Sequence, residues 1–140
     1  MKILVVNGPN LNMLGIREPS LYGVVTYPKL VELINTWAKE LGIEVECYQS
    51  NHEGDLIDKI QSGLNKIDGL IINAGGYTHT SIALLDAVKS INVKAVEVHI
   101  TNIYEREEFR HISYVGKACN EHYIGLGIEG YKKALEYFVK

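Results

Sequence analysis

Short runs of β-branched and apolar residues alternate with amphipathic segments along the whole 140-residue sequence. The first run is continuously apolar, as expected for a strand that is covered on both faces. The predicted strands cover residues 3–6, 43–48, 69–73, 94–99 and 122–126. The predicted helices cover residues 27–41, 53–66, 80–90 and 128–139, with a short helix or ordered loop at 102–110. This alternation predicts right-handed βαβ units and therefore a parallel sheet with helices on both faces.

The number of strands favours an α/β, flavodoxin-like three-layer sandwich with a five-stranded parallel sheet of order 2-1-3-4-5. A chain of 140 residues buries roughly 68% of its unfolded surface, so it needs no disulfide or metal to fold. We expect a single catalytic domain that spans residues 1–140.

Net charge and cysteine content indicate which binding partners and which cellular compartment to expect for this protein. A net charge of −3 and an isoelectric point near 5.9 argue against a nucleic-acid surface, which needs clustered Lys and Arg. Cys47 and Cys119 lie far apart and form no CxxC pair, which indicates reduced thiols. The apolar run that ends at Asn7 is too short for a signal-peptide core or a membrane span. We expect a cytoplasmic protein that binds neither nucleic acid nor membranes.

Folds of this kind bind ligands beyond the carboxyl ends of their strands, which selects residues 7–23, 50–53, 73–81 and 99–110 as the candidate site. A GxGxxG pattern at residues 125–130 comes too close to the end of the sequence for the strand and acidic residue of a dinucleotide site. We interpret it as a strand-to-helix turn.

A phosphoacceptor receiver domain shares the predicted architecture but needs carboxylates for a divalent cation. Asn7, Asn10 and Asn73 stand where those carboxylates would be, which argues against a receiver domain. The five histidines do not pair at the helical spacing of zinc ligands, so we expect no metal site.

Two of the polar loops contain candidate acid–base groups. His99 ends an apolar strand, a position that suits a structural and a catalytic histidine equally well. Asn10 lies in an Asn-rich turn whose amides either form the turn or stabilise an oxyanion without adding charge. Arg17 and Tyr22 lie in a long loop bounded by glycines, which is typical of a lid.

Tyr22 would serve as a base near neutral pH only if its pKa fell by about two to three units from about 10. That shift corresponds to about 3–4 kcal/mol, which one or two desolvated arginines supply. The alternative is an ordinary packed aromatic beside a surface Arg–Glu pair.

The loops at 73–81 and 99–110 contain groups that suit an anionic ligand. The glycine-rich loop at 73–81 leads into a helix that either Thr80 or Ser81 could cap, and its exposed amides favour an anion. It lacks the lysine of a phosphate loop, so a carboxylate or a polyol fits better. Arg106 and Arg110 lie one helical turn apart, either in the site or on a solvated face neutralised by neighbouring glutamates.

Together these segments resemble the type II 3-dehydroquinate dehydratases over essentially the whole chain. The motifs are NGPNLN at 7–12, REP followed by YG at 17–23, QSNHEG at 49–54, YTHTS at 77–81, EVH at 97–99 and EEFRHIS at 107–113. Each motif alone is weak, and their shared order makes the resemblance strong.

The resemblance implies a cofactor-free anti elimination of water from 3-dehydroquinate, through an enolate, to give 3-dehydroshikimate in aromatic amino-acid biosynthesis. It implies that Tyr22 is the base, assisted by Arg17, and that His99 is the acid, oriented by Glu97. The remaining implied roles are a water on Asn10 at the enolate oxygen, carboxylate binding by Asn73, Ile100 and Thr101, hydroxyl binding by His79, Asp86 and Arg110, and a supporting role for Arg106.

The resemblance also implies trimers assembled into a dodecamer, with Asp86 reaching the site of a neighbouring subunit. Ala74, Leu85 and Tyr104 depart from residues that are common in the family. Every lysine lies outside the four polar loops, which argues against Schiff-base catalysis. Two alternatives stay open: another hydro-lyase or isomerase acting on a hydroxy acid, and a binding module that has lost catalysis.

Overall fold

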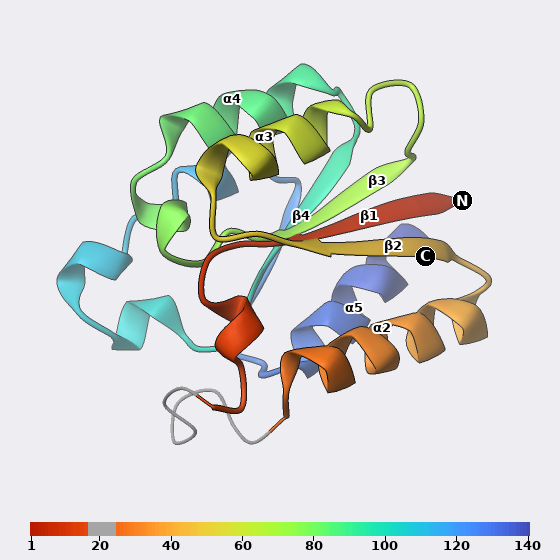
Figure 1. Cartoon of the computed structure of the whole chain (residues 1–140), viewed down its shortest axis with the longest axis horizontal. Helices are drawn as coiled ribbons and strands as arrows, with labels where there is room; N and C mark the ends of the chain where they lie inside the picture. Colours follow the sequence, from red (N-terminus) through yellow and green to blue (C-terminus); the bar gives the residue numbers. More distant parts are fainter. Residues whose placement is uncertain (17–24) are drawn as a thin grey trace.

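A computed structural model describes residues 1–16 and 25–140, and it contains one five-stranded parallel sheet. Its order is β2-β1-β3-β4-β5, which confirms the predicted flavodoxin-like topology. The strands are β1 (Lys2–Asn7), β2 (Glu44–Gln49), β3 (Gly69–Asn73), β4 (Lys94–His99) and β5 (Glu121–Ile124). Because all neighbouring strands are parallel, their carboxyl ends lie along one edge, on the left in Figure 1.

Two pairs of helices cover the two faces of the sheet (Figure 1). The pair α3 (Glu53–Gln61) and α4 (Ile82–Ser90) lies on one face, and the pair α2 (Tyr27–Leu41) and α5 (Glu129–Phe138) lies on the other. The alternation of side chains along β1 divides the core accordingly. Ile3 and Val5 pack with α2 and α5, whereas Leu4 and Val6 pack with α3 and α4.

Two helices are at least two residues shorter than predicted, and α5 is one residue shorter at each end. The helix that begins at Glu53 ends at Gln61 and not at residue 66, and it is followed by turns in which Asn65 has a φ of 61°. The next helix begins at Ile82 and not at residue 80. It is preceded by a 3-10 turn, and the Ser81 hydroxyl caps it by accepting a 2.9 Å hydrogen bond from the Leu84 amide.

The segment predicted as a short helix or ordered loop at 102–110 forms two 3-10 turns, Ile103–Glu105 and Glu108–Arg110. The fifth strand covers Glu121–Ile124 and ends two residues before its predicted end, because Gly125 has a φ of 81°. Gly125 and Gly127 donate backbone hydrogen bonds to the carbonyl oxygens of His99 and Ile100. The GxGxxG pattern is therefore a strand-to-helix turn, and it holds the end of β4 in place.

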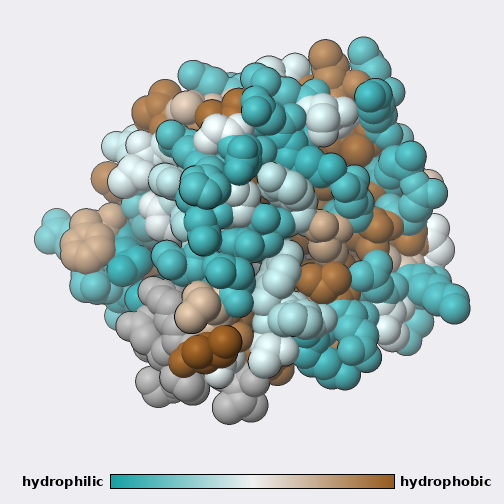
Figure 2. Space-filling view, in the orientation of Figure 1, coloured by the Kyte–Doolittle hydropathy of each residue, from teal (hydrophilic) through white to brown (hydrophobic). Residues whose placement is uncertain are grey.

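The face of the molecule in Figure 2 is mostly hydrophilic, with separate hydrophobic patches, one of them beside the atoms drawn in grey. Close to the end of the first described segment, at residue 16, the side chains of Met13 and Ile16 are exposed. No helix in the described part of the chain is long and apolar enough to cross a membrane.

Candidate active site

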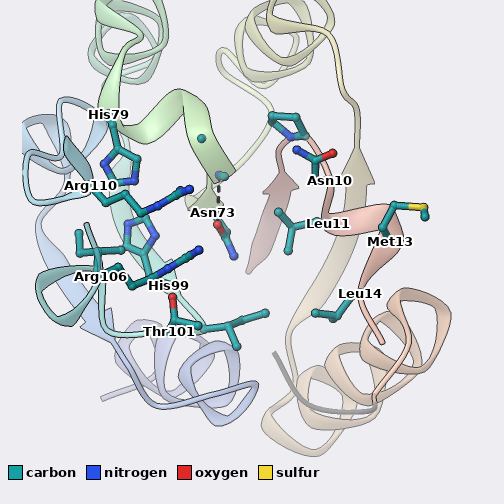
Figure 3. Close-up of a pocket in the computed structure, with 15 residues that line it drawn as sticks. Asn10, Leu11, Met13, Leu14, Asn73, His79, His99, Thr101, Arg106 and Arg110 are labelled. Atoms are coloured by element: carbon teal, nitrogen blue, oxygen red, sulfur yellow. Dashed lines mark hydrogen bonds between the residues drawn. The ribbon is translucent and has the colours of Figure 1, made fainter. Parts of the chain in front are cut away.

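A cavity of about 230 Å³ opens at the carboxyl ends of β1, β3 and β4. The loop after β1 forms one wall, and the turns after β4 form the opposite wall (Figure 3). Asn73 lies between them at the end of β3. Eight of the predicted site residues line this cavity: Asn10, Asn73, His79, His99, Ile100, Thr101, Arg106 and Arg110.

The Asn-rich wall is held by the end of β2. Asn10 has the left-handed φ of 72°, and its backbone amide donates a 3.0 Å hydrogen bond to Oδ1 of Asn51. Gln49 Nε2 donates to the carbonyl oxygen of Gly8 at 3.1 Å. A Cβ at Gly8 would lie 2.3 Å from the carbonyl oxygen of Ala74, so only glycine allows this approach. Contacts at the ends of β2 and β3, the two strands that flank β1, therefore fix the position of this wall.

A buried polar network connects this wall to β3. The Tyr131 hydroxyl, from α5, donates to Oδ1 of Asn7 at 2.6 Å and accepts from Nδ2 of Asn73 at 3.0 Å. Burial raises the pKa of Tyr131, so its hydroxyl stays protonated. Oδ1 of Asn73 accepts from the Gly75 amide at 3.2 Å. One N–H of the Asn73 amide remains to face the cavity that this residue lines.

His99 is paired with a buried carboxylate at the back of the cavity. Its Nε2 lies 2.6 Å from Oε2 of Glu97, whose side chain is 2% exposed. The Ser113 hydroxyl also donates to this carboxylate, and His122 Nδ1 lies 2.7 Å from Oε1. Burial alone would raise the pKa of Glu97, but the hydrogen bonds from His99, Ser113 and His122 lower it to about 2. Glu97 is therefore an anion that holds His99 through Nε2.

His79 approaches His99 from the turn after β3, and the two rings stack with centroids 6.5 Å apart. Nδ1 of His79 donates to the carbonyl oxygen of Ile112 at 2.8 Å. Burial lowers the pKa of His79, and the nearby His99 and Arg110 lower it further, which outweighs the opposing effect of that hydrogen bond. A neutral His79 presents Nε2 as a hydrogen-bond acceptor.

Arg106 and Arg110 supply the positive charge of the cavity. Their side chains are 14% and 23% exposed, and both line the cavity. Arg110 Nε lies 2.9 Å from Oε1 of Glu107, and Arg106 Nε lies 3.9 Å from the same atom. The solvated-face alternative accounts for the Glu107 contacts, but it does not account for the burial of the two guanidinium groups.

The structure does not bring every predicted site residue into the cavity. Arg17 and Tyr22 lie outside the described residues. Asp86 is exposed on α4 and does not line the cavity, and Glu97 lies behind His99. Among residues 1–16 and 25–140, no group of three or more His, Cys, Asp or Glu side chains lies close enough to hold a metal ion.

Sequence reasoning missed three residues that support the site: Tyr131, Ser113 and His122. Each is far along the chain from its partner, so no local spacing reveals the contact. One signal was present for His122. It lies in an edge strand beside a strand that already carries Glu97 and His99, and parallel pairing places Glu97 opposite His122.

The strand order and the position of the cavity show to which structural class the protein belongs. The cavity lies beyond β1 and β3, where the strand order reverses, and this is where flavodoxin-like α/β proteins bind their ligands. It contains a carboxylate-paired histidine, a second histidine and two arginines, which together suit acid–base chemistry on a small anionic molecule.

Comparison with known proteins identifies the family within that class. The chain belongs to the class II dehydroquinase family, whose model matches residues 1–139. A 3-dehydroquinate dehydratase of Endomicrobium trichonymphae is 56% identical over 99% of this chain and 96% of its own length.

Two crystal structures of type II dehydroquinases are similar to this chain in fold and in sequence. The type II dehydroquinase of Butyrivibrio crossotus has a TM-score of 0.98 and 54% identity, covering 100% of this chain and 98% of its own. That of Propionibacterium acnes has a TM-score of 0.96 and 38% identity, covering 99% and 95%.

Proposed function

We propose that this protein dehydrates 3-dehydroquinate to 3-dehydroshikimate, an anti elimination through an enolate in the shikimate pathway. The observation that carries the proposal is the Glu97–His99 pair at the back of an arginine-lined cavity, in a chain of this family. Loss of water from a β-hydroxy ketone requires a base, an oxyanion stabiliser and an acid. We expect no cofactor or metal to take part.

We assign the acid step to His99. Because Nε2 donates to Glu97, the doubly protonated ring carries its second proton on Nδ1. That proton passes to the C1 hydroxyl as the C–O bond breaks, and water leaves. The buried carboxylate fixes the orientation of the ring by accepting a hydrogen bond from Nε2, so Glu97 acts as a positioning residue.

We assign the other contacts from the resemblance to the family, and the residues concerned all line the cavity. Asn10 orients a water towards the enolate oxygen, and the free N–H of Asn73 binds the substrate carboxylate with the backbone of Ile100 and Thr101. His79 and Arg110 bind the ring hydroxyls, and a neutral Nε2 on His79 accepts a hydroxyl hydrogen. Arg106 adds positive charge to the same wall, which stabilises an anionic ligand.

The base assignment rests on the resemblance to the family. Tyr22 takes the C2 proton, and Arg17 lowers the free energy of its phenolate. We expect Tyr22→Phe to abolish turnover by at least about a thousandfold, in line with the loss of a group that acts as a unit with others. Substrate binding, followed by calorimetry with 3-dehydroquinate, should persist. Near-normal turnover of Tyr22→Phe would rule out this tyrosine as the base.

The proposed activity is tested by following the absorbance of the conjugated enone product with 3-dehydroquinate near neutral pH. We expect turnover in a buffer that contains a chelator and no added metal. Absence of turnover by folded protein would contradict the proposal and favour a binding module. Turnover of a different hydroxy acid, with none of 3-dehydroquinate, would favour another hydro-lyase.

We further propose that the protein assembles into trimers and dodecamers in the cytoplasm and that Asp86 contacts the substrate of a neighbouring subunit. Asp86 is exposed on α4 beside Ile82, whose side chain is 50% exposed, so this helix presents a partly apolar surface. Sedimentation should show a multiple of three subunits. Asp86→Asn should raise KM and leave the assembly intact, whereas a stable active monomer would exclude the role of Asp86.

A further inference from the structure

Glu97 joins two histidines from neighbouring strands. Its Oε2 lies 2.6 Å from His99 Nε2, and its Oε1 lies 2.7 Å from His122 Nδ1. Glu97 and His122 are register partners in the β4–β5 ladder, so the backbone itself holds them opposite each other. The Glu97 side chain is 2% exposed and that of His122 is 41% exposed. The carboxylate thus connects the cavity histidine to a histidine that reaches solvent.

We propose that His122 is a positioning residue that sets the strength of His99 as a proton donor through the shared Glu97 carboxylate. The proposal rests on the proposed function, because it takes His99 to be the acid. A carboxylate only accepts hydrogen bonds, so both Nε2 of His99 and Nδ1 of His122 carry a hydrogen. The bond from His122 withdraws negative charge from Glu97 and weakens its hold on the His99 imidazolium.

Counting protons excludes a simple relay from solvent through this chain of groups. A proton delivered by His122 to Glu97 could move on only to Nε2 of His99, which already carries a hydrogen. The proton that leaves with the hydroxyl comes from Nδ1, and that nitrogen must be reloaded from the cavity. His122 therefore acts on the acidity of His99 through charge and hydrogen bonding, without passing a proton to it.

Other charged and titratable groups surround the pair. His79, Arg106 and Arg110 line the cavity with His99. Behind the sheet edge, burial and the charge of Glu97 raise the pKa of the Cys119 thiol to about 12, so it is neutral. Glu121 accepts a hydrogen bond from the His122 backbone amide. None of these groups is changed when the His122 side chain is replaced, so a comparison of His122 variants isolates its contribution.

Two substitutions separate the hydrogen bond from the packing. His122→Val removes the donor and keeps a residue that suits a strand. His122→Asn retains an N–H donor near the place of Nδ1. We expect the apparent pKa of the alkaline limb of the pH profile of kcat to be higher in His122→Val by roughly half a unit to one unit. The reason is that Glu97 regains the negative charge that the hydrogen bond from His122 withdraws, and only part of that change reaches His99. In His122→Asn the apparent pKa should return towards its original value.

The second readout does not depend on activity. The His99 ring, isotopically labelled and followed by NMR in substrate-free protein, should titrate at higher pH in His122→Val than in the parent. His122→Ala serves as a second donor-free variant in case the valine prevents folding. Lys39→Gln is the control, because Lys39 is exposed on α2 and does not line the cavity, and it should change neither readout.

Three outcomes overturn the proposal or separate it from the proposed function. An unchanged alkaline limb and His99 titration in a folded donor-free variant would overturn it. A shift that His122→Asn fails to restore would do the same, because packing would then be the cause. A parent protein without turnover would contradict the proposed function, while the NMR comparison would still decide whether His122 acts on His99.

Discussion

At the scale of single residues, this site depends on buried polar side chains that form hydrogen bonds with one another. The Tyr131 hydroxyl is fully buried, and it satisfies Oδ1 of Asn7 and Nδ2 of Asn73 at once. A buried polar atom that loses its partner costs about 1–3 kcal/mol, more than the hydrogen bond itself contributes. The aromatic ring of Tyr131 packs in the core, so the hydroxyl is the only part that a Phe substitution removes.

Tyr131→Phe should therefore lower the free energy of unfolding by about 1–3 kcal/mol, measured by chemical denaturation at neutral pH. It should also raise KM, because Asn73 loses the contact that orients its amide. Tyr137→Phe on the same helix is the matched control, because Tyr137 is only half-buried and lies outside the network of Asn7, Asn73 and Tyr131. Equal unfolding midpoints for the two variants would show that the buried network adds no stability.

At the scale of elements, the sequence predicted those strands and helix ends that depend on interactions between residues close together in the chain. The five strands, and a cap at Thr80 or Ser81, could be predicted because apolar runs and capping residues act within a few positions; the structure shows that Ser81 is the cap. The end of α3 could not, because the apolar spacing continues to Leu64, whose side chain is 49% exposed. The support of His79 by the Ile112 carbonyl could not be predicted either, because 33 residues separate them.

The Ser81 cap gives a prediction for α4. Ser81 is 3% exposed, and its hydroxyl accepts from the Leu84 amide at 2.9 Å. Ser81→Ala leaves that amide without its side-chain partner, so we expect a loss of about 1 kcal/mol in the free energy of unfolding. Ser81→Thr retains the oxygen and should lose less. Thermal unfolding of both variants tests this, and an equal loss in both would assign the effect to packing.

At the scale of the whole molecule, the sheet order gathers into one cavity the loops that the sequence separates. The motifs predicted eight of the residues that line it, because a parallel sheet brings all carboxyl strand ends to one edge. The family resemblance implied the contact between Glu97 and His99, but the sequence analysis missed the two other hydrogen bonds on Glu97, which come from His122 in β5 and from Ser113 in the segment between β4 and β5. Those bonds make the stability of the molecule depend on pH.

The pKa of Glu97 falls from 4.5 to about 2 on folding, so its contribution is present above about pH 4.5 and is lost as the pH falls towards 2. The shift corresponds to a contribution on the order of 3 kcal/mol. We expect Glu97→Gln to be less stable than the parent at neutral pH and the difference to shrink below pH 4.5. Chemical denaturation across this range measures both curves.

The lowered pKa of His79 adds a second loss of stability, which begins as the pH falls below its ordinary value of 6.5 and is common to both proteins. Glu107→Gln is the control, because Glu107 also has a lowered pKa but its side chain is 53% exposed, where solvent screens the ion pair with Arg110. Its pH curve should stay close to that of the parent. A difference between Glu97→Gln and the parent that stays constant from neutral pH to pH 2 would mean that the buried carboxylate is not the source of the acid sensitivity.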